Sequence, residues 1–319
     1  MSDRAFLLED PTGVRILYDP GSTVAGSGDG RLGPVHVALL SHVHSDHLGN
    51  AKLAGDPSGT DAKCDGSFAK ASAVPNSNLA EIAAASNSAV LVSSEVAALL
   101  SRKIQAVRGT PTQSCSATGS SNLLVVPLSA PCVGNIGFGA KRTVTMAADM
   151  PGVGITVVTA IHGNALDNSF VASPLSENLA GSGLSLTVGP PIGYVLTFTN
   201  GLVLYLSGDT GHTADMSAIV RDYYHARLAI LNIGDVFTTG PAEAAYAAKN
   251  LLQVAAVIPS HANEVATSDG QLLPGSKTAR FVTALEGLPT FLPLSGHTMT
   301  FNGEAACVGG CDAAAASSR

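Results

Sequence analysis

Four side chains that can bind a metal ion, His42, His44, Asp46 and His47, lie within six consecutive positions. They follow the apolar run at 37–40, so we expect them where a buried strand ends and a loop begins. Imidazole and carboxylate groups are ligands of zinc, manganese and iron. His42 and His44 face the same side of an extended chain, whereas Asp46 and His47 lie past the bend. The spacing therefore predicts two neighbouring metal positions.

The pattern His-x-His-x-Asp-His at 42–47, placed after a strand, resembles the signature of the metallo-β-lactamase superfamily of metallohydrolases. The resemblance implies that another histidine, an aspartate and a last histidine follow, each at a strand end. Three residues meet this requirement directly after apolar runs: His162, Asp209 and His261. Each of them alone would be read as a core histidine or a turn residue, and only their order makes them ligand candidates.

The pattern of elements is also similar to that superfamily. We expect β-hairpins at 5–18 and 193–206, the second around the turn pair Asn200-Gly201. Helices are expected at 77–85, 93–104, 214–224, 241–252 and 277–285. The implied fold class is α/β, a four-layer αββα sandwich. We expect a single domain over 1–319, with insertions near 51–76 and 164–191 and a flexible C-terminal tail.

Three further motifs are most similar to one branch of the superfamily, the ascorbate-6-phosphate lactonase-like hydrolases: Gly-Asp-Thr-Gly at 208–211, Gly-Pro-Ala-Glu-Ala-Ala at 240–245 and Ile-Pro-Ser-His at 258–261. That branch usually shows a short strand with Gly-His before the first hairpin. This chain starts inside that strand.

The resemblance assigns seven ligands to two divalent ions: His42, His44 and His162 to the first, Asp46, His47 and His261 to the second, and Asp209 as the bridge. Two carboxylates leave the two ions a net charge near +2, which would strongly acidify a bridging water. The expected reaction is hydrolysis by a metal-bound hydroxide, with Asp46 or Asp209 as the catalytic group that passes a proton to the leaving group. Seven nitrogen and oxygen ligands without a thiolate suit zinc, the favoured ion, and also manganese.

The residues around these ligands allow several readings. Three of them are candidates for substrate contact or for supporting the ligands: His212, Asn263 and Glu264. His212 can equally orient Asp209, contact substrate or begin the next helix. The other histidines are interpreted as structural or surface residues: His36, His225 and His297.

The fold does not choose the substrate, because function in such a fold depends on the pocket walls. We expect a small molecule with a lactone, ester or amide carbonyl. The alternative is a phosphodiesterase or other phosphoester hydrolase, which would need extra cationic contacts, and the segment at 164–191 has no Lys or Arg. A further alternative is a non-hydrolytic metal-binding protein of the same fold. The redox members carry an acidic residue in place of one first-cluster histidine and a flavin domain, and this sequence shows neither.

The composition indicates which classes of partner the protein is expected to bind. With 45% hydrophobic residues, a net charge of −7 and only 17 Lys plus Arg, the sequence predicts a sizeable core and neither a nucleic-acid nor a membrane partner. It leaves a homo-oligomer open. Five cysteines without a Cys-x-x-Cys pair exclude a zinc knuckle, and Cys307 and Cys311 are either a disulfide or free thiols. No signal peptide is recognised, which indicates a cytoplasmic protein as written, or a periplasmic or secreted one if a leader was removed.

Overall fold

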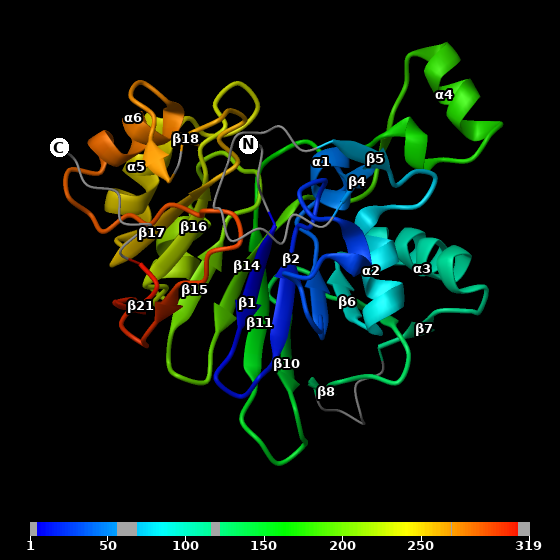
Figure 1. The fold of residues 1–319 in the computed structure, drawn as a ribbon, viewed down its shortest axis with the longest axis horizontal. Helices are drawn as coiled ribbons and strands as arrows, with labels where there is room; N and C mark the ends of the chain where they lie inside the picture. The colour runs from blue at the N-terminus through cyan, green and yellow to red at the C-terminus, as the bar shows by residue number, and fades with distance from the viewer. Residues whose placement is uncertain (1–4, 56–68, 116–121, 269, 312–319) are drawn as a thin grey trace.

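Two β-sheets lie face to face at the centre of the computed structural model, which describes residues 5–55, 69–115, 122–268 and 270–311 (Figure 1). The six-stranded sheet has the order β1 (Phe6–Glu9), β2 (Arg15–Tyr18), β3 (Val37–Leu39), β6 (Ala89–Val92), β9 (Cys132–Asn135) and β7 (Gln113–Ser114). The seven-stranded sheet has the order β17 (Ala256–Ser260), β16 (Leu228–Asn232), β15 (Val203–Leu206), β14 (Ile192–Thr197), β11 (Val153–Thr159), β10 (Lys141–Thr145) and β8 (Leu123–Val125).

Helices cover the outer face of each sheet. The six-stranded sheet packs against α2 (Asn78–Ser86) and α3 (Ser94–Arg108), on the right in Figure 1. The seven-stranded sheet packs against η3 (Met216–Arg221), α5 (Pro241–Tyr246), η4 (Ala247–Leu252) and α6 (Lys277–Ala284). The four layers confirm the predicted αββα sandwich.

The remaining elements are short. They are η1 (Gly26–Gly28), α1 (Ser45–Leu48), β4 (Ala51–Leu53), β5 (Lys70–Ser72), β12 (Ala165–Leu166), η2 (Asn168–Phe170), α4 (Leu175–Ser182), β13 (Leu186–Thr187), β18 (Thr267–Ser268), β19 (Gln271–Leu272), β20 (Thr300–Phe301) and β21 (Cys307–Gly309). Among the described residues, no helix combines the length and apolarity needed to cross a bilayer.

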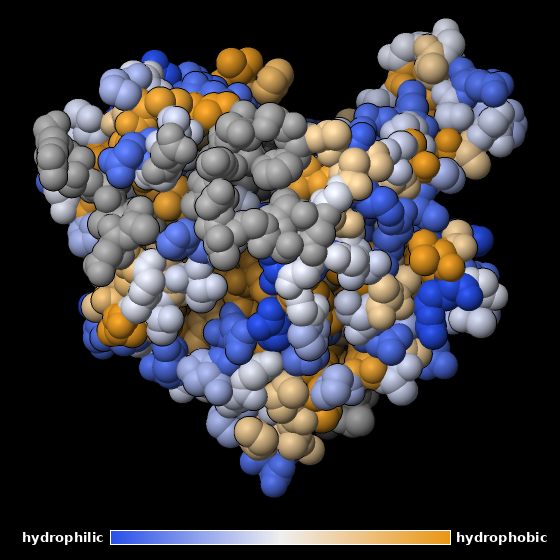
Figure 2. Space-filling model, viewed as in Figure 1, coloured by the Kyte–Doolittle hydropathy of each residue, from blue (hydrophilic) through white to orange (hydrophobic). Residues whose placement is uncertain are grey.

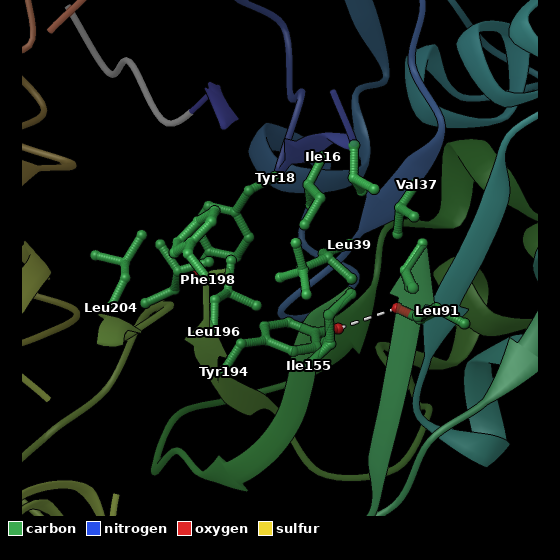
Figure 3. Close-up of a cluster of buried hydrophobic side chains, with 14 of the residues drawn as sticks. Ile16, Tyr18, Val37, Leu39, Leu91, Ile155, Tyr194, Leu196, Phe198 and Leu204 are labelled. Atoms are coloured by element: carbon green, nitrogen blue, oxygen red, sulfur yellow. Dashed lines mark hydrogen bonds between the residues drawn. The ribbon is translucent and has the colours of Figure 1, made fainter. Parts of the chain in front are cut away.

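The layers follow from the alternation of side chains along each strand. In β3, Val37 and Leu39 join the core between the sheets, whereas Ala38 packs against the helices. The two sheets are also joined by a buried tyrosine in the core shown in Figure 3. Tyr194 on β14 donates its hydroxyl toward the carbonyl oxygens of Leu40 and Leu91, at 2.8 and 3.1 Å.

Strand direction brings the predicted ligands together. β2 and β3 are parallel neighbours, as are β15, β16 and β17. β11 is antiparallel to β14, which is antiparallel to β15, so β11 and β15 point the same way. The ends of these strands therefore meet at one edge of the sandwich.

Several element predictions need correction. Helix α3 continues to Arg108 and ends at Gly109, which adopts the left-handed conformation (φ +72°). The expected helix at 214–224 is a six-residue π-helix, η3. In the insertion near 51–76, β4 and β5 pair as antiparallel strands, so this part is not irregular. The predicted flexible tail at 312–319 lies outside the described residues.

The structure shows two disulfides among the described residues. Cys115 beside β7 and Cys132 on β9 form a disulfide that the sequence did not indicate. Cys307 and Cys311 also form a disulfide, which was one of the two readings left open. Cys64 lies outside the described residues.

Candidate metal centre

All seven predicted ligands lie in segments that follow strands at this edge. His42 and His44 come after β3, His162 after β11, Asp209 after β15 and His261 after β17. Asp46 and His47 lie on the single-turn helix α1, past the bend. Three groups of side chains have ligand atoms within 4.8 Å of one another: His42, His44 and His162; His42, His47 and Asp209; and Asp46, His47 and His261.

The first group has the spacing of ligands around a tetrahedral ion. His44 Nδ1 lies 3.0 Å from His42 Nε2 and 3.3 Å from His162 Nε2. Two nitrogens bound to one tetrahedral zinc at 2.0–2.1 Å would be separated by about 3.3 Å. The three nitrogens thus already approach the positions that such an ion requires.

Asp209 lies between the group of His42, His44 and His162 and the group of Asp46, His47 and His261. Its Oδ2 atom is 2.8 Å from His261 Nε2, 3.5 Å from His47 Nε2 and 3.7 Å from His162 Nε2. His261 Nε2 is also 3.7 Å from Asp46 Oδ2. One carboxylate oxygen therefore faces imidazoles of both groups, as a bridging ligand would.

Two buried atoms of this cluster have no hydrogen-bond partner among the described residues: His47 Nε2 and Asp209 Oδ1. Leaving such atoms buried without a partner costs free energy unless a ligand satisfies them. The donor set of imidazole and carboxylate groups suits a divalent ion of the zinc and manganese type. The residues fit the metal that the sequence predicts.

Asp19, which the sequence analysis missed, orients His47. Its Oδ2 atom accepts hydrogen bonds from His47 Nδ1 at 2.8 Å and from Ser41 Oγ at 2.6 Å, and Oδ1 accepts from Ser41 N at 2.8 Å. With Nδ1 engaged in this way, Nε2 of His47 is the atom left to face Asp209. The available signal was the position of Asp19 directly after β2, at the edge where the ligands gather.

Ser41 extends the same network to His42. Its hydroxyl lies 3.0 Å from His42 Nδ1 while it donates to Asp19. The hydroxyl can therefore accept the proton of His42 Nδ1, which leaves Nε2 of that ring directed at His44. One buried carboxylate thus fixes two of the imidazoles.

Hydrogen bonds between loops hold the strand ends in place. Thr210, next to Asp209, accepts from Ile161 N through its Oγ1 at 2.9 Å. Thr210 O accepts from Thr239 N at 3.2 Å. Asn164 Oδ1 accepts from Val43 N at 2.8 Å, which ties the loop of His162 to that of His42.

Glycine is required where the chain passes closest to the site. A Cβ at Gly21 (φ +50°) would lie 2.1 Å from the carbonyl oxygen of Asp46. A Cβ at Gly234 would lie 2.8 Å from His261 Nδ1. Larger residues would displace Asp46 or His261.

The carboxylates dominate the electrostatics. Burial disfavours a charged His47, but Asp209 and Asp19 outweigh burial and raise the pKa of His47 to about 9. Burial would raise the pKa of Asp209, yet His47 and His261 hold it well below the ordinary value. Burial, together with neighbouring His47, keeps the pKa of His42 well below normal. Without a metal, the centre therefore holds an ionised Asp209, a protonated His47 and a neutral His42, and a metal that binds His47 must displace its proton.

His212 and Glu264, two of the candidates for substrate contact or ligand support, each hydrogen-bond to backbone outside the imidazole cluster. His212 Nε2 donates to the carbonyl oxygen of Glu243 at 2.7 Å, and its ring centroid lies 5.6 Å from that of Tyr246, so it packs on α5. Glu264 accepts a hydrogen bond from the backbone N–H of Lys277, the first residue of α6, and so caps that helix. A contact of either residue with the substrate or with the ligands stays a prediction.

Asn263 lies two residues after His261, and both have positive φ, +57° and +56°. Together they turn the chain sharply at the end of β17. Asn263 therefore shapes the loop that carries His261.

The insertion at 164–191 is more ordered than a simple lid. Its ends pair as β12 and β13, and Asn164 donates to the carbonyl oxygens of Val188 and Gly189. Helix α4 has no buried residue and projects from the rest of the molecule at the upper right of Figures 1 and 2. The base of the insertion touches the loops of the candidate centre through the hydrogen bond between Asn164 and Val43.

The sequence model of a protein family, the beta-lactamase superfamily domain, matches residues 2–261 of this chain. The matched range ends at His261, the last candidate ligand. The chain belongs to the beta-lactamase superfamily. A metal-dependent hydrolase from Polaromonas sp. strain JS666 is 35% identical over 124 residues, which cover 39% of this chain and 41% of the relative. The chain thus matches less than half of the length of that relative.

A metal-dependent hydrolase from Polynucleobacter asymbioticus is 25% identical over 289 residues, covering 88% of this chain and 77% of the relative. Among solved structures, isothiocyanate hydrolase from Delia radicum gut bacteria aligns with a TM-score of 0.51 and 16% identity. That alignment covers 94% of this chain and 97% of the other. It shows a shared fold.

Proposed function

We propose that this protein is a metal-dependent hydrolase that acts on the carbonyl group of a small molecule, a lactone, an ester or an amide. The observation that carries the proposal is the position of Asp209 Oδ2, within 3.7 Å of imidazole nitrogens of His47, His162 and His261. The names of the relatives, which are metal-dependent hydrolases, support the same class of reaction.

The proposed ligands divide into two sets. His42, His44 and His162 would hold one divalent ion, Asp46, His47 and His261 would hold the second, and Asp209 would contact both. Such ions acidify a bound water to a pKa of about 7 and polarise the substrate oxygen. Zinc is the favoured ion, and manganese is the alternative.

Of the two proposed proton-transfer residues, Asp46 is the better placed. Its side chain is 46% exposed, whereas that of Asp209 is 5% exposed. A leaving group approaching from solvent can reach Asp46, while Asp209 is enclosed by the imidazoles. Asp46 would thus deliver the proton, and Asp209 would position the imidazoles around it.

The charges near the site favour a carbonyl over a phosphoester. The residues that line the two described cavities next to His261 include no Lys or Arg, and Lys277, which lies near His261, donates its Nζ proton to the carbonyl oxygen of Gly234 at 2.7 Å. A phosphodiester carries a negative charge in the ground state and usually meets cationic side chains. Phosphoester hydrolysis remains the second candidate, because metal ions themselves can bind phosphate oxygens.

The test is hydrolysis of a substrate panel before and after chelation, and after reconstitution with zinc or manganese. The panel contains a homoserine lactone, p-nitrophenyl esters, bis-p-nitrophenyl phosphate and nitrocefin. We expect turnover of a lactone or ester that chelation abolishes and metal restores. Exclusive turnover of the phosphodiester would select the second candidate. Metal binding without any turnover would support a non-hydrolytic protein.

A further inference from the structure

A cavity of about 50 Å³ lies at the end of β17, and its lining includes His261 but none of the other six candidate ligands. Among the residues that line it are His261, Ala266, Thr267, Thr278, Leu292 and Leu294. The segment that carries His261 continues as one of its walls. The residues that line this cavity include no Asp, Glu, Lys or Arg.

The lining combines aliphatic groups with one unsatisfied hydroxyl. Thr267 is 4% exposed, and its Oγ1 atom has no hydrogen-bond partner among the described residues. A buried hydroxyl of this kind favours an occupant with a polar atom that can pair with it. The aliphatic walls disfavour a charged occupant.

The geometry of the chain ties this cavity to the candidate centre. The left-handed residues His261 and Asn263 turn the chain so that the imidazole of His261 reaches Asp209 at 2.8 Å. The next residues fold over the cavity and pair as β18 and β19. Glu264 fixes this turn to the start of α6. A group in the cavity therefore lies beside a proposed metal ligand.

We propose that this cavity is the subsite for a neutral, mainly apolar substituent next to the reactive carbonyl. The proposal rests on the proposed function and narrows it to neutral short-chain acyl substrates. A water-sized group needs about 10–15 Å³ in this measure of volume, so the cavity holds about four non-hydrogen atoms. The propyl chain of a butyryl group, with three carbons, fits, and the heptyl chain of an octanoyl group, with seven, does not.

The first test measures binding without turnover. Saturation-transfer NMR would follow butyramide, a neutral probe, on the metal-loaded protein. We expect saturation in the wild-type protein and in Ala85→Leu, a control at an exposed alanine of α2. Ala266→Leu adds three carbons to a lining side chain and should reduce the signal at least fivefold. Thr267→Val removes the hydroxyl at nearly constant shape and should weaken binding by about threefold or more.

The second test measures kcat/KM for p-nitrophenyl acetate, propionate, butyrate and octanoate. For the wild-type protein we expect a rise of about three- to fourfold per methylene up to butyrate, then a fall at octanoate. Ala266→Leu should move the optimum to acetate, and Ala85→Leu should leave it at butyrate.

The two tests distinguish failure of the proposed subsite from failure of the proposed function. Ester hydrolysis with the same chain-length profile and butyramide signal in Ala266→Leu as in wild type would overturn the subsite and leave the proposed function intact. Butyramide binding that Ala266→Leu removes, without hydrolysis of any ester, would overturn the proposed function and still support a neutral ligand in the cavity. If Ala266→Leu does not fold, equal butyramide binding by Thr267→Val and wild type would overturn the subsite.

Discussion

At the scale of single residues, Asp19 determines which nitrogen of His47 faces the candidate centre. Asp19→Asn would replace one acceptor oxygen with an NH₂ donor. Oδ2 of Asp19 accepts from His47 Nδ1 and Ser41 Oγ, and Oδ1 accepts from Ser41 N, so in either orientation the NH₂ group of the amide would face a donor. We expect metal affinity to fall about 10- to 100-fold.

Competition with a chromophoric chelator measures this effect. The matched control is Asp149→Asn, a change at an exposed aspartate in the β10–β11 turn. Equal metal affinity in the Asp19 variant, the control and the wild-type protein would remove the orienting role of Asp19.

Among single residues, the candidate ligands could be found from the sequence, whereas Asp19 could not. Seven candidate ligands could be found because each follows an apolar run, and the family pattern orders them. Asp19 follows a strand too, but it begins the turn Asp-Pro-Gly, and a turn explains an aspartate fully. Its role depends on β2 lying next to β3, which no local pattern specifies.

At the scale of elements, Asp10 joins two hairpins. It lies after β1 and accepts hydrogen bonds from the backbone N–H and hydroxyl of Thr199, at 2.8 and 2.7 Å, in the turn between β14 and β15. Burial would raise the pKa of Asp10, but the hydrogen bonds from Thr12 and Thr199 outweigh burial and lower it.

Because the pKa of Asp10 is lower in the folded state than in the unfolded state, its contribution to the free energy of unfolding decreases at acidic pH. The stabilisation by Asp10 is complete above the unfolded value of 3.8, and it is lost as pH falls through the folded value. Asp10→Asn should therefore reduce the free energy of unfolding at pH 7 by about 1–3 kcal/mol. Below the folded pKa the difference should shrink toward zero.

Urea unfolding at several pH values tests this linkage, again with Asp149→Asn as the control. A destabilisation by Asp10→Asn that stays the same from pH 7 down to the acid limit would show that the carboxylate charge is not its cause.

Helix α4 is expected to be dispensable for folding, because none of its residues is buried. Replacing residues 174–183 with a Gly-Ser-Gly linker would keep the paired strands β12 and β13 and the buried Phe170. We expect the free energy of unfolding to change by less than about 1 kcal/mol and metal content to stay the same. Calorimetry and metal analysis measure both, and loss of metal would show that α4 supports the centre.

Sequence patterns located most long elements but missed some short ones. Helix α2 was predicted from Ser77, whose hydroxyl accepts from Ala80 N as an N-cap. Strand β9 was missed because Cys-Val-Gly-Asn is short and contains glycine. Its pairing with β6 and the disulfide to Cys115 are contacts between distant parts of the chain.

At the scale of the whole molecule, two sheets bury one apolar core between them, and a helical layer covers each outer face. The order of the expected strands and helices, together with the family resemblance, was sufficient to predict these four layers. The strand order within each sheet was not predicted, because parallel neighbours such as β3 and β6 are separated by a helix and other short elements. That order brings the ends of β2, β3, β11, β15 and β17 to one edge.

The most direct test of the account is the number of metal ions per chain, measured by mass spectrometry after purification without added metal and again after loading with zinc or manganese. We predict two ions in the wild-type protein and in His225→Ala, whose exposed ring hydrogen-bonds to the carbonyl oxygen of Arg221. His44→Ala and Asp209→Ala should bind fewer ions and lose hydrolysis. Wild-type metal content in all three variants, or no metal in the loaded wild-type protein, would contradict the central claim.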